Sequence, residues 1–530
     1  MHHIHGADAP VHSTWLPDMP GNRAIAVLIA CIAAVNAYSF AMVASIPLVQ
    51  SDVWRFLDGS LGKFITDGFA WSELLAQANP EDTNLPLQKL FLWFHTHYFG
   101  MDFRLEGLLG VIAGVLLVLL LARVVIALPL RRWTSPECWL LAALALATLS
   151  LNSTNVYTWP LATQWFLPLL LAATYFAVVQ ARIGSGLFLL VATFLLGMLL
   201  DEVALPVFVA ALAALLLAKP TRSLVAARRL VLFGGGGLVA ARLVYWASAV
   251  AIGNADAKGS RSFAVLLDTG IWKTAFIPFS DAIIHQSNQP ALLGVGGLAF
   301  AWTIAVLSVL AHLWFWWRCV FVARSAERGY SAATFIAAAV MLFFYGLVLG
   351  VVLQRVPTFG FDYLHQPRYV MFHQLHLAAL AMMFYRDYRY APSYGGRQVA
   401  AAVMVSMILA FGALQVRLST MAWEHAKYLS KYVEGAALTL GRLAADPAAD
   451  IPCADILTVC DYPVEKRRAM LDLLVRHRLN IFSPEFQAFH RLYPYPPAAI
   501  PEPSRVGSGT DDAAPGKTDP VPAGADSEAA

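Results

Sequence analysis

Long apolar stretches alternate with short polar connections along most of the chain, as in proteins that cross a membrane several times. A helix needs about 20 mostly apolar residues to span the hydrocarbon core of a bilayer. Eleven stretches have this character, although some of them are short. They cover 24–48, 105–128, 137–151, 161–181, 184–200, 203–218, 229–252, 291–317, 332–354, 370–385 and 398–416. The pattern therefore predicts an all-α polytopic membrane protein with about eleven transmembrane helices.

The composition agrees with this pattern and excludes a soluble globular protein. Of the 530 residues, 58% are hydrophobic and 13% are charged, whereas soluble domains carry about 25% charged residues. The formal net charge is only +3, and we expect no nucleic-acid partner. Residues 1–23 lack the basic segment and cleavage site of a signal peptide, so we expect them to form a cytoplasmic leader.

Lysine and arginine are concentrated in alternate loops, and this asymmetry predicts the orientation in the membrane. Cytoplasmic loops are enriched in these residues. The basic loops contain Arg123, Arg131, Arg132, Arg182, Lys219, Arg222, Arg228, Arg229, Arg318, Arg324, Arg328, Arg386, Arg389 and Arg397. The opposite connections at 49–104, 152–160, 201–202, 253–290 and 355–369 are poorer in Lys and Arg. We therefore expect a cytoplasmic N-terminus and an extracytoplasmic C-terminus.

Two long outer loops, 49–104 and 253–290, are too apolar to be simple linkers. The stretch "NLPLQKLFLWFHTHYFG" (84–100) places Leu87, Leu90, Phe91, Phe94 and Tyr98 at helical spacing. It predicts an amphipathic helix that lies in the membrane interface. The loops could instead fold on themselves for stability alone. Because both belong to one face, we favour a covered cavity at the membrane surface.

The C-terminal part divides into two segments. Residues 418–495 have mixed polarity and predict a small extracytoplasmic helical domain with two amphipathic helices. Residues 496–530 are rich in Pro, Ala, Gly and Asp, and we expect them to be disordered. Cys453 and Cys460 lie in the first segment, where either a disulfide or a pair of buried thiols is compatible with the sequence.

Three arginines stand out because they lie in or beside the predicted spans on the outer side. An ionisable group inside a span costs about 2.5 kcal/mol or more, so it is a functional candidate by default. Arg242 follows a glycine run that allows another backbone to approach closely, and Arg355 and Arg368 flank the 355–369 connection. Snorkelling and anchoring to lipid head groups are the alternatives. We favour anion binding because several arginines converge on one side.

Among the outer acids, Asp52 is held at a fixed depth because it directly follows the first apolar stretch, in "SDVWRFLDG" (51–59). Asp201 and Glu202 occupy a tight turn, where they could cap the following helix. Asp102 belongs to the group of loop acids, most of which we expect to be solvated. His95 and His97 point to different faces of a helix, so we expect no shared metal site.

Two passages resemble a known family. "SDVWRFL" (51–57) is followed by an amphipathic helix and by "HYFGMDFRLEGLLGVIAGVLLVLLLARVV" (97–125), which is similar to the entrance of the second span in the C-type (GT-C fold) polytopic glycosyltransferases. "QPRYVMFHQLHLAAL" (366–380) is similar to the entrance of a late span there. The resemblance is to bacterial protein mannosyltransferase-like, aminoarabinose transferase-like and O-antigen-modifying members, and it covers most of 24–495.

The resemblance implies transfer of a hexosyl or pentosyl unit from a polyprenyl-phosphate donor to a glycan, lipid or protein acceptor, with inversion of configuration. Asp52 would be the general base. Arg368 and Tyr369, with Arg242 or Arg355, would bind the donor phosphate. The implied location is the inner (plasma) membrane of a bacterium, with the reaction on the periplasmic side.

The sequence also departs from the family pattern. Many relatives have a second acid where this chain has Val53, and the outer loop at 151–159 has no acid at all. This weakens a metal requirement, although a divalent cation stays open as a cofactor, with Asp201, Glu202 and Asp102 as accessory acids. The alternative functions are a transporter or flippase of a lipid-linked or anionic substrate, and an O-antigen ligase-like or polymerase-like enzyme.

Overall fold

The computed structural model describes residues 20–75, 86–159, 165–217, 220–252, 263–322, 332–390 and 394–492. These residues form α-helices with short 3-10 and π-helical segments, and no β-strand occurs among them. The principal helices are α1 (Pro20–Ala44), α6 (Arg104–Ile126), α7 (Ser135–Thr148), α10 (Phe166–Arg182), α11 (Gly186–Leu200), α12 (Ala204–Leu216), α13 (Pro220–Arg229), α14 (Gly235–Ile252), α17 (Gly297–Trp317), α19 (Ala332–Gln354), α22 (Leu375–Tyr390) and α23 (Tyr394–Ala445).

Within the described residues, seven helical stretches are long and apolar enough to cross a membrane. They are Pro20–Ala44, Arg104–Ile126, Gly186–Leu216, Leu224–Ser248, Gln286–Phe321, Ala332–Gln354 and Gly395–Ala445. Two shorter apolar helices, Ser135–Thr148 and Phe166–Arg182, lie among them. The all-α membrane class therefore agrees with the structure, while the count of eleven spans stays a prediction.

The stretch Gly186–Leu216 contains a reversal of the chain. Asp201 adopts a left-handed backbone conformation with φ 45°, and a 3-10 turn at Asp201–Val203 joins α11 to α12. A Cβ atom on Gly234 would meet both Thr193 and Phe208, which lie on the two sides of this turn. The two helices therefore lie side by side, which is the arrangement that the tight turn at 201–202 predicted.

The glycine run before Arg242 allows α14 to approach α11 closely, as expected from the sequence. A Cβ atom on Gly237 would overlap the backbone of Leu190 and Phe194 on α11. By contrast, a Cβ atom on Gly236 would meet nothing within 4 Å. Small residues at such positions permit the close backbone packing that helices in membranes use.

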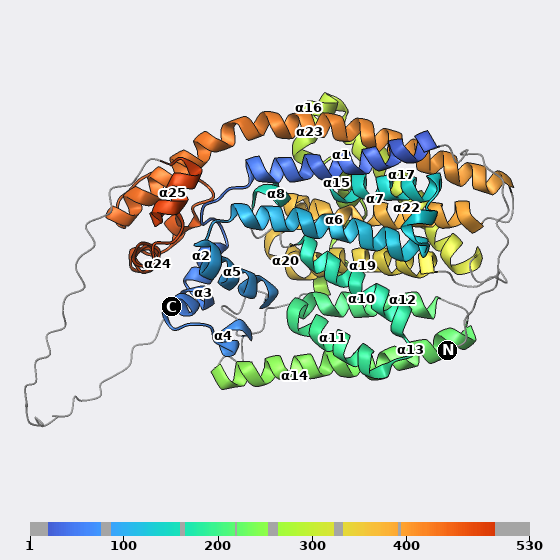
Figure 1. Cartoon of the computed structure of the whole chain (residues 1–530), viewed down its shortest axis with the longest axis horizontal. Coiled ribbons are helices and arrows are strands. Elements are labelled where there is room, and N and C mark those ends of the chain that lie inside the picture. Colours follow the sequence, from blue (N-terminus) through green and yellow to red (C-terminus); the bar gives the residue numbers. More distant parts are fainter. Residues whose placement is uncertain are drawn as a thin grey trace, which may run out of the picture. The chain divides into compact units, whose positions relative to one another are not determined.

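The first loop and the C-terminal segment gather at one end of the helices (Figure 1). The first loop forms α2 (Val53–Leu57), α3 (Ser60–Thr66), α4 (Trp71–Leu75) and α5 (Pro86–Phe99), and the second forms η4 (Phe263–Leu267), η5 (Thr269–Ala275) and α15 (Ile277–Ile283). The helix predicted at 84–100 is thus present as α5. Its apolar face remains exposed at Phe94 and Tyr98, while Gln88 and His95 are buried against the protein.

The last long helix differs from the predicted division at 417/418. Helix α23 continues without a break from Tyr394 to Ala445, beside α1 (Figure 1). No proline interrupts this stretch, so the amphipathic segment at its end extends the apolar span rather than starting a new helix. The chain then forms α24 (Val464–Arg476) and α25 (Pro484–His490), and Cys453 is disulfide-bonded to Cys460. The predicted tail at 496–530 lies outside the described residues.

Candidate functional site

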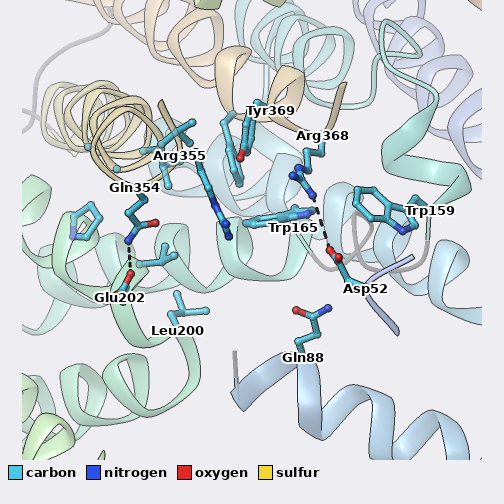
Figure 2. Close-up of a pocket in the computed structure, with 17 residues that line it drawn as sticks. Asp52, Gln88, Trp159, Trp165, Leu200, Glu202, Gln354, Arg355, Arg368 and Tyr369 are labelled. Carbon is cyan, nitrogen blue, oxygen red and sulfur yellow. Dashed lines mark hydrogen bonds and ion pairs between the residues drawn. The ribbon is translucent and has the colours of Figure 1, made fainter. Parts of the chain in front are cut away.

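A cavity of about 190 Å³ opens where the first loop meets the start of α12 and the end of α19 (Figure 2). Its polar lining comes from the first loop (Asp52 and Gln88), the turn after α11 (Glu202), the end of α19 (Gln354 and Arg355) and the 3-10 helix η10 at Pro367–Tyr369 (Arg368 and Tyr369). Trp159, Trp165 and Phe372 supply aromatic walls. Five of the residues singled out in the sequence therefore share one cavity: Asp52, Glu202, Arg355, Arg368 and Tyr369.

Asp52 reaches the cavity because the chain turns sharply after α1. Ser51 adopts φ 50°, and Asp52 directly precedes the short helix α2 without a side-chain capping hydrogen bond. Val53 and Trp54, the first residues of α2, are fully buried and hold this turn against the protein. The Asp52 side chain remains 41% exposed on the cavity side, and its carboxylate accepts no hydrogen bond from the described residues. Apart from its ion pair with Arg368, the carboxylate can accept a hydrogen bond from a hydroxyl group.

Arg368 faces Asp52 across the cavity, with Nη1 4.0 Å from Asp52 Oδ2. Its guanidinium group lies 5.2, 5.7 and 5.5 Å from the ring centroids of Trp159, Tyr363 and Tyr369, within range for cation–π attraction. Nη2 donates to the Tyr363 hydroxyl, while Nε has no partner among the described residues. An arginine keeps its charge at all relevant pH values, so the cavity contains a fixed cation.

A hydrogen bond between His365 and the buried Asp281 fixes the segment that carries Arg368. His365 Nδ1 lies 2.8 Å from a carboxylate oxygen of Asp281, whose side chain is fully buried. On the other side, Lys273 Nζ lies 2.8 Å from Asp362, and its hydrogen bond lowers the pKa of that exposed carboxyl group. Both partners, Asp281 and Lys273, belong to the second outer loop. The second loop therefore supports the segment that carries Arg368 and does not line the cavity itself.

Two further groups extend the polar lining of the cavity. Arg355 points between the Glu202–Gln354 pair and the Asp52–Arg368 pair (Figure 2). Gln354 Nε2 donates to Glu202. Burial raises the pKa of Tyr369 to about 12, so this phenol stays protonated at neutral pH. The cavity thus holds two guanidinium groups, which suit an anion, and two carboxylates, of which Glu202 accepts a hydrogen bond from Gln354 and Asp52 lies beside Arg368.

The structure does not bring Arg242, Asp201 or Asp102 to the cavity. Arg242 Nη1 donates to Asp201, so these two predicted site residues neutralise each other between α14 and the turn after α11. Asp102 Oδ2 lies 2.8 Å from His490 Nε2, and its other oxygen accepts from the backbone amide of Arg104. Each acid therefore links two separate segments of the chain. Nothing in their local sequence revealed these partners, because each partner lies on a distant or separate element.

Sequence reasoning missed Trp159, Tyr363 and the Asp281–His365 pair. Trp159 ends the 151–159 loop, which drew attention only for its lack of acids, and Tyr363 and His365 lie in the connection that already contained Arg368. Aromatic residues beside an outer arginine were the available signal. In the described part of the chain, no three His, Cys, Asp or Glu side chains converge as a metal site requires, and His95 is buried against Phe103.

Comparison with protein-family models, curated proteins and solved structures gives no match to this chain.

Proposed function

We propose that the protein is a membrane glycosyltransferase that moves a hexosyl or pentosyl unit from a polyprenyl-phosphate donor to an acceptor hydroxyl. The observation that carries the proposal is the pairing of Asp52 with Arg368 across one cavity at the outer ends of the helices, 4.0 Å apart. The acceptor is a glycan, lipid or protein. The proposed location is the extracytoplasmic face of a bacterial inner membrane.

In the proposed reaction, Asp52 accepts the proton of the acceptor hydroxyl while its oxygen attacks the anomeric carbon of the sugar. The bond between that carbon and the phosphate oxygen breaks, and the polyprenyl phosphate leaves with the electron pair. Attack opposite the leaving group inverts the configuration. A carboxylate placed to accept the proton typically accelerates such a step by about 10²–10⁴-fold.

Arg368 and Arg355 bind the donor phosphate and stabilise its charge as it leaves. A guanidinium group suits this role because its planar donors match phosphate oxygens two at a time. Without a donor, Asp52 and Arg368 are near enough to attract each other. When a phosphate takes the place of Asp52 beside Arg368, the carboxylate is released for its role as base. Trp159, Trp165 and Tyr369 offer apolar ring faces around the sugar and limit the access of water, which suppresses hydrolysis.

The test compares Asp52→Asn with Asp67→Asn in reconstituted protein. Asp67 is an exposed acid of the same outer loop and does not line the cavity, so it is a matched control. Transfer is measured from a panel of polyprenyl-phosphate hexoses and pentoses to cell-envelope acceptors. We expect Asp52→Asn to lose about 10²–10⁴-fold in rate while Asp67→Asn keeps it. Equal activity of the two variants would refute the role of Asp52.

A further inference from the structure

The C-terminal segment forms hydrogen bonds to the turn that carries Asp52. The backbone amide of Ser51 donates to the Ile456 carbonyl at 2.8 Å, and the Ser51 carbonyl accepts from the Thr458 hydroxyl at 2.9 Å. Both backbone polar groups of the residue before Asp52 are therefore held by one distant loop. Ser51 needs such support, because a non-glycine residue at φ 50° is in a conformation that is costly without it.

The loop that holds Ser51 is itself closed by a disulfide. Cys453 and Cys460 are seven positions apart, and both Ile456 and Thr458 lie between them. Leu457 and Val459 alternate with these two residues and are buried. The ring is thus anchored by its apolar side chains while it presents one carbonyl and one hydroxyl group to Ser51. A closed ring has fewer conformations than an open chain, so the disulfide limits where these two groups can go.

A second residue of the C-terminal segment, Asn480, holds the chain just before this turn. Asn480 is 1% exposed, and its Nδ2 donates to the carbonyls of Pro47 at 2.9 Å and Met101 at 2.7 Å. Its own backbone amide donates to the Gly100 carbonyl at 2.8 Å. In addition, Lys466 pairs with Asp58 at 2.7 Å, just beyond α2. The chain is therefore held by C-terminal residues both before and after Asp52.

We infer that the disulfide-closed loop 453–460 is the positioning element that sets where Asp52 lies in the cavity, with Thr458 as a positioning residue. This inference rests on the proposed function for its catalytic consequence, but not for its structural one. When the disulfide is broken, loop 453–460 no longer holds the Ser51 backbone in place. The Asp52 carboxylate can then move away from its position opposite Arg368. Misplacement of a reacting group by about 1 Å can cost about 10²-fold in rate. Binding of the donor phosphate to Arg368 and Arg355 is unaffected.

The first experiment replaces Thr458 in the full-length protein in nanodiscs. Thr458→Val removes the hydroxyl that holds Ser51, and Thr458→Ser keeps it. Thr439→Val is the matched control, because that hydroxyl donates within its own helix to Gly435. We expect Thr458→Val to lower kcat about 10- to 100-fold with KM for the donor unchanged. Thr458→Ser and Thr439→Val should keep the wild-type kcat.

The second experiment reads the structural consequence without any substrate. Hydrogen–deuterium exchange is measured over residues 47–58 before and after reduction of the wild-type protein with dithiothreitol. We expect faster exchange at the Ser51 amide after reduction, and the Cys453→Ser/Cys460→Ser variant should show the same rate without reductant. Cys31→Ser, which changes a free cysteine on α1, is the control and should leave the exchange unchanged. Because folded wild-type protein is reduced in place, a variant that fails to fold does not remove the test.

Unchanged exchange at Ser51 after reduction would overturn the positioning inference, whatever the transfer assay shows. Faster exchange would support it even for a protein without measurable transfer. Faster exchange together with unaltered transfer would leave the positioning in place and refute the catalytic role of Asp52 instead. The two failures are therefore distinguishable.

Discussion

Replacement of Arg368 by lysine separates its charge from its geometry. The variant keeps a cation but loses the planar fork of donors and the packing among the rings of Trp159, Tyr363 and Tyr369. A hydrogen bond to a charged group contributes about 1.5–3 kcal/mol. Cation–π contacts add about 0.5–1 kcal/mol each at exposed sites. Lysine keeps part of the hydrogen bonding and part of the cation–π attraction. We therefore expect the binding free energy for a lipid phosphate to weaken by about 2–3 kcal/mol, which is about 30- to 150-fold in affinity.

The assay measures binding of decaprenyl phosphate to the protein in nanodiscs, with the uncharged alcohol decaprenol as the ligand that shares its tail. Arg242→Lys is the control variant, because Arg242 is also an arginine of a helix but is paired with Asp201 and does not line the cavity. We expect Arg368→Lys to weaken binding of the phosphate by the stated factor and to leave binding of decaprenol unchanged. Arg242→Lys should bind the phosphate within a factor of about two of the wild type.

Two results would refute this reasoning. If Arg368→Lys binds decaprenyl phosphate as the wild type does, Arg368 does not hold the phosphate. If Arg242→Lys loses as much affinity for decaprenyl phosphate as Arg368→Lys does, a position in the cavity is not what makes Arg368 important for binding. Thermal unfolding of each variant, compared with the wild type, checks that the loss is one of binding and not of folding.

The remaining predictions concern stability. His95 is buried, and this lowers its pKa to about 4, so the unfolded chain binds a proton below pH 6.5 that the folded protein accepts only near pH 4. Stability should fall as the pH drops from about 7 to 4, by about 3 kcal/mol from this group, and the melting temperature of His95→Phe should depend less on pH over this range. Gly237→Ala should lower the melting temperature through a loss of about 1–3 kcal/mol, because its methyl group overlaps α11, whereas Gly236→Ala should not. Equal melting temperatures of the two glycine variants, or parallel pH profiles of His95→Phe and wild type, would contradict these expectations.

Much of the helical architecture could be read from the sequence, because helix formation in a membrane depends on features within each segment. The apolar stretches at 105–128 and 332–354 correspond closely to Arg104–Ile126 and Ala332–Gln354. In both cases the backbone hydrogen bonds are made inside the segment, and the side chains need only be apolar. Helix α5 was also predicted from features within its own segment, the helical spacing of its apolar residues. Its buried face was not, because the choice between lipid and protein contact depends on what packs against it.

The candidate site shows the same division. Asp52 and Arg368 were singled out from their places at the ends of apolar stretches, and Arg242 from its place within one. From the sequence alone, Arg242 and Arg355 were alternative partners of Arg368 in binding the donor phosphate. In the structure, Arg242 pairs with Asp201, while Arg368 faces Asp52. The partners lie on separate elements in each case, so no local pattern could distinguish them.

The sequence by itself therefore determined that the chain is apolar, helical and suited to a membrane, and that its unusual charges lie near the ends of its apolar stretches. Only the tertiary structure decided which of those charges share a cavity, and that a disulfide-closed loop more than 400 positions away holds the backbone beside Asp52. The physical reason is the range of the interactions. Hydrophobic periodicity and helical hydrogen bonds act over a few residues, whereas a cavity and its ion pairs form only where remote segments pack together.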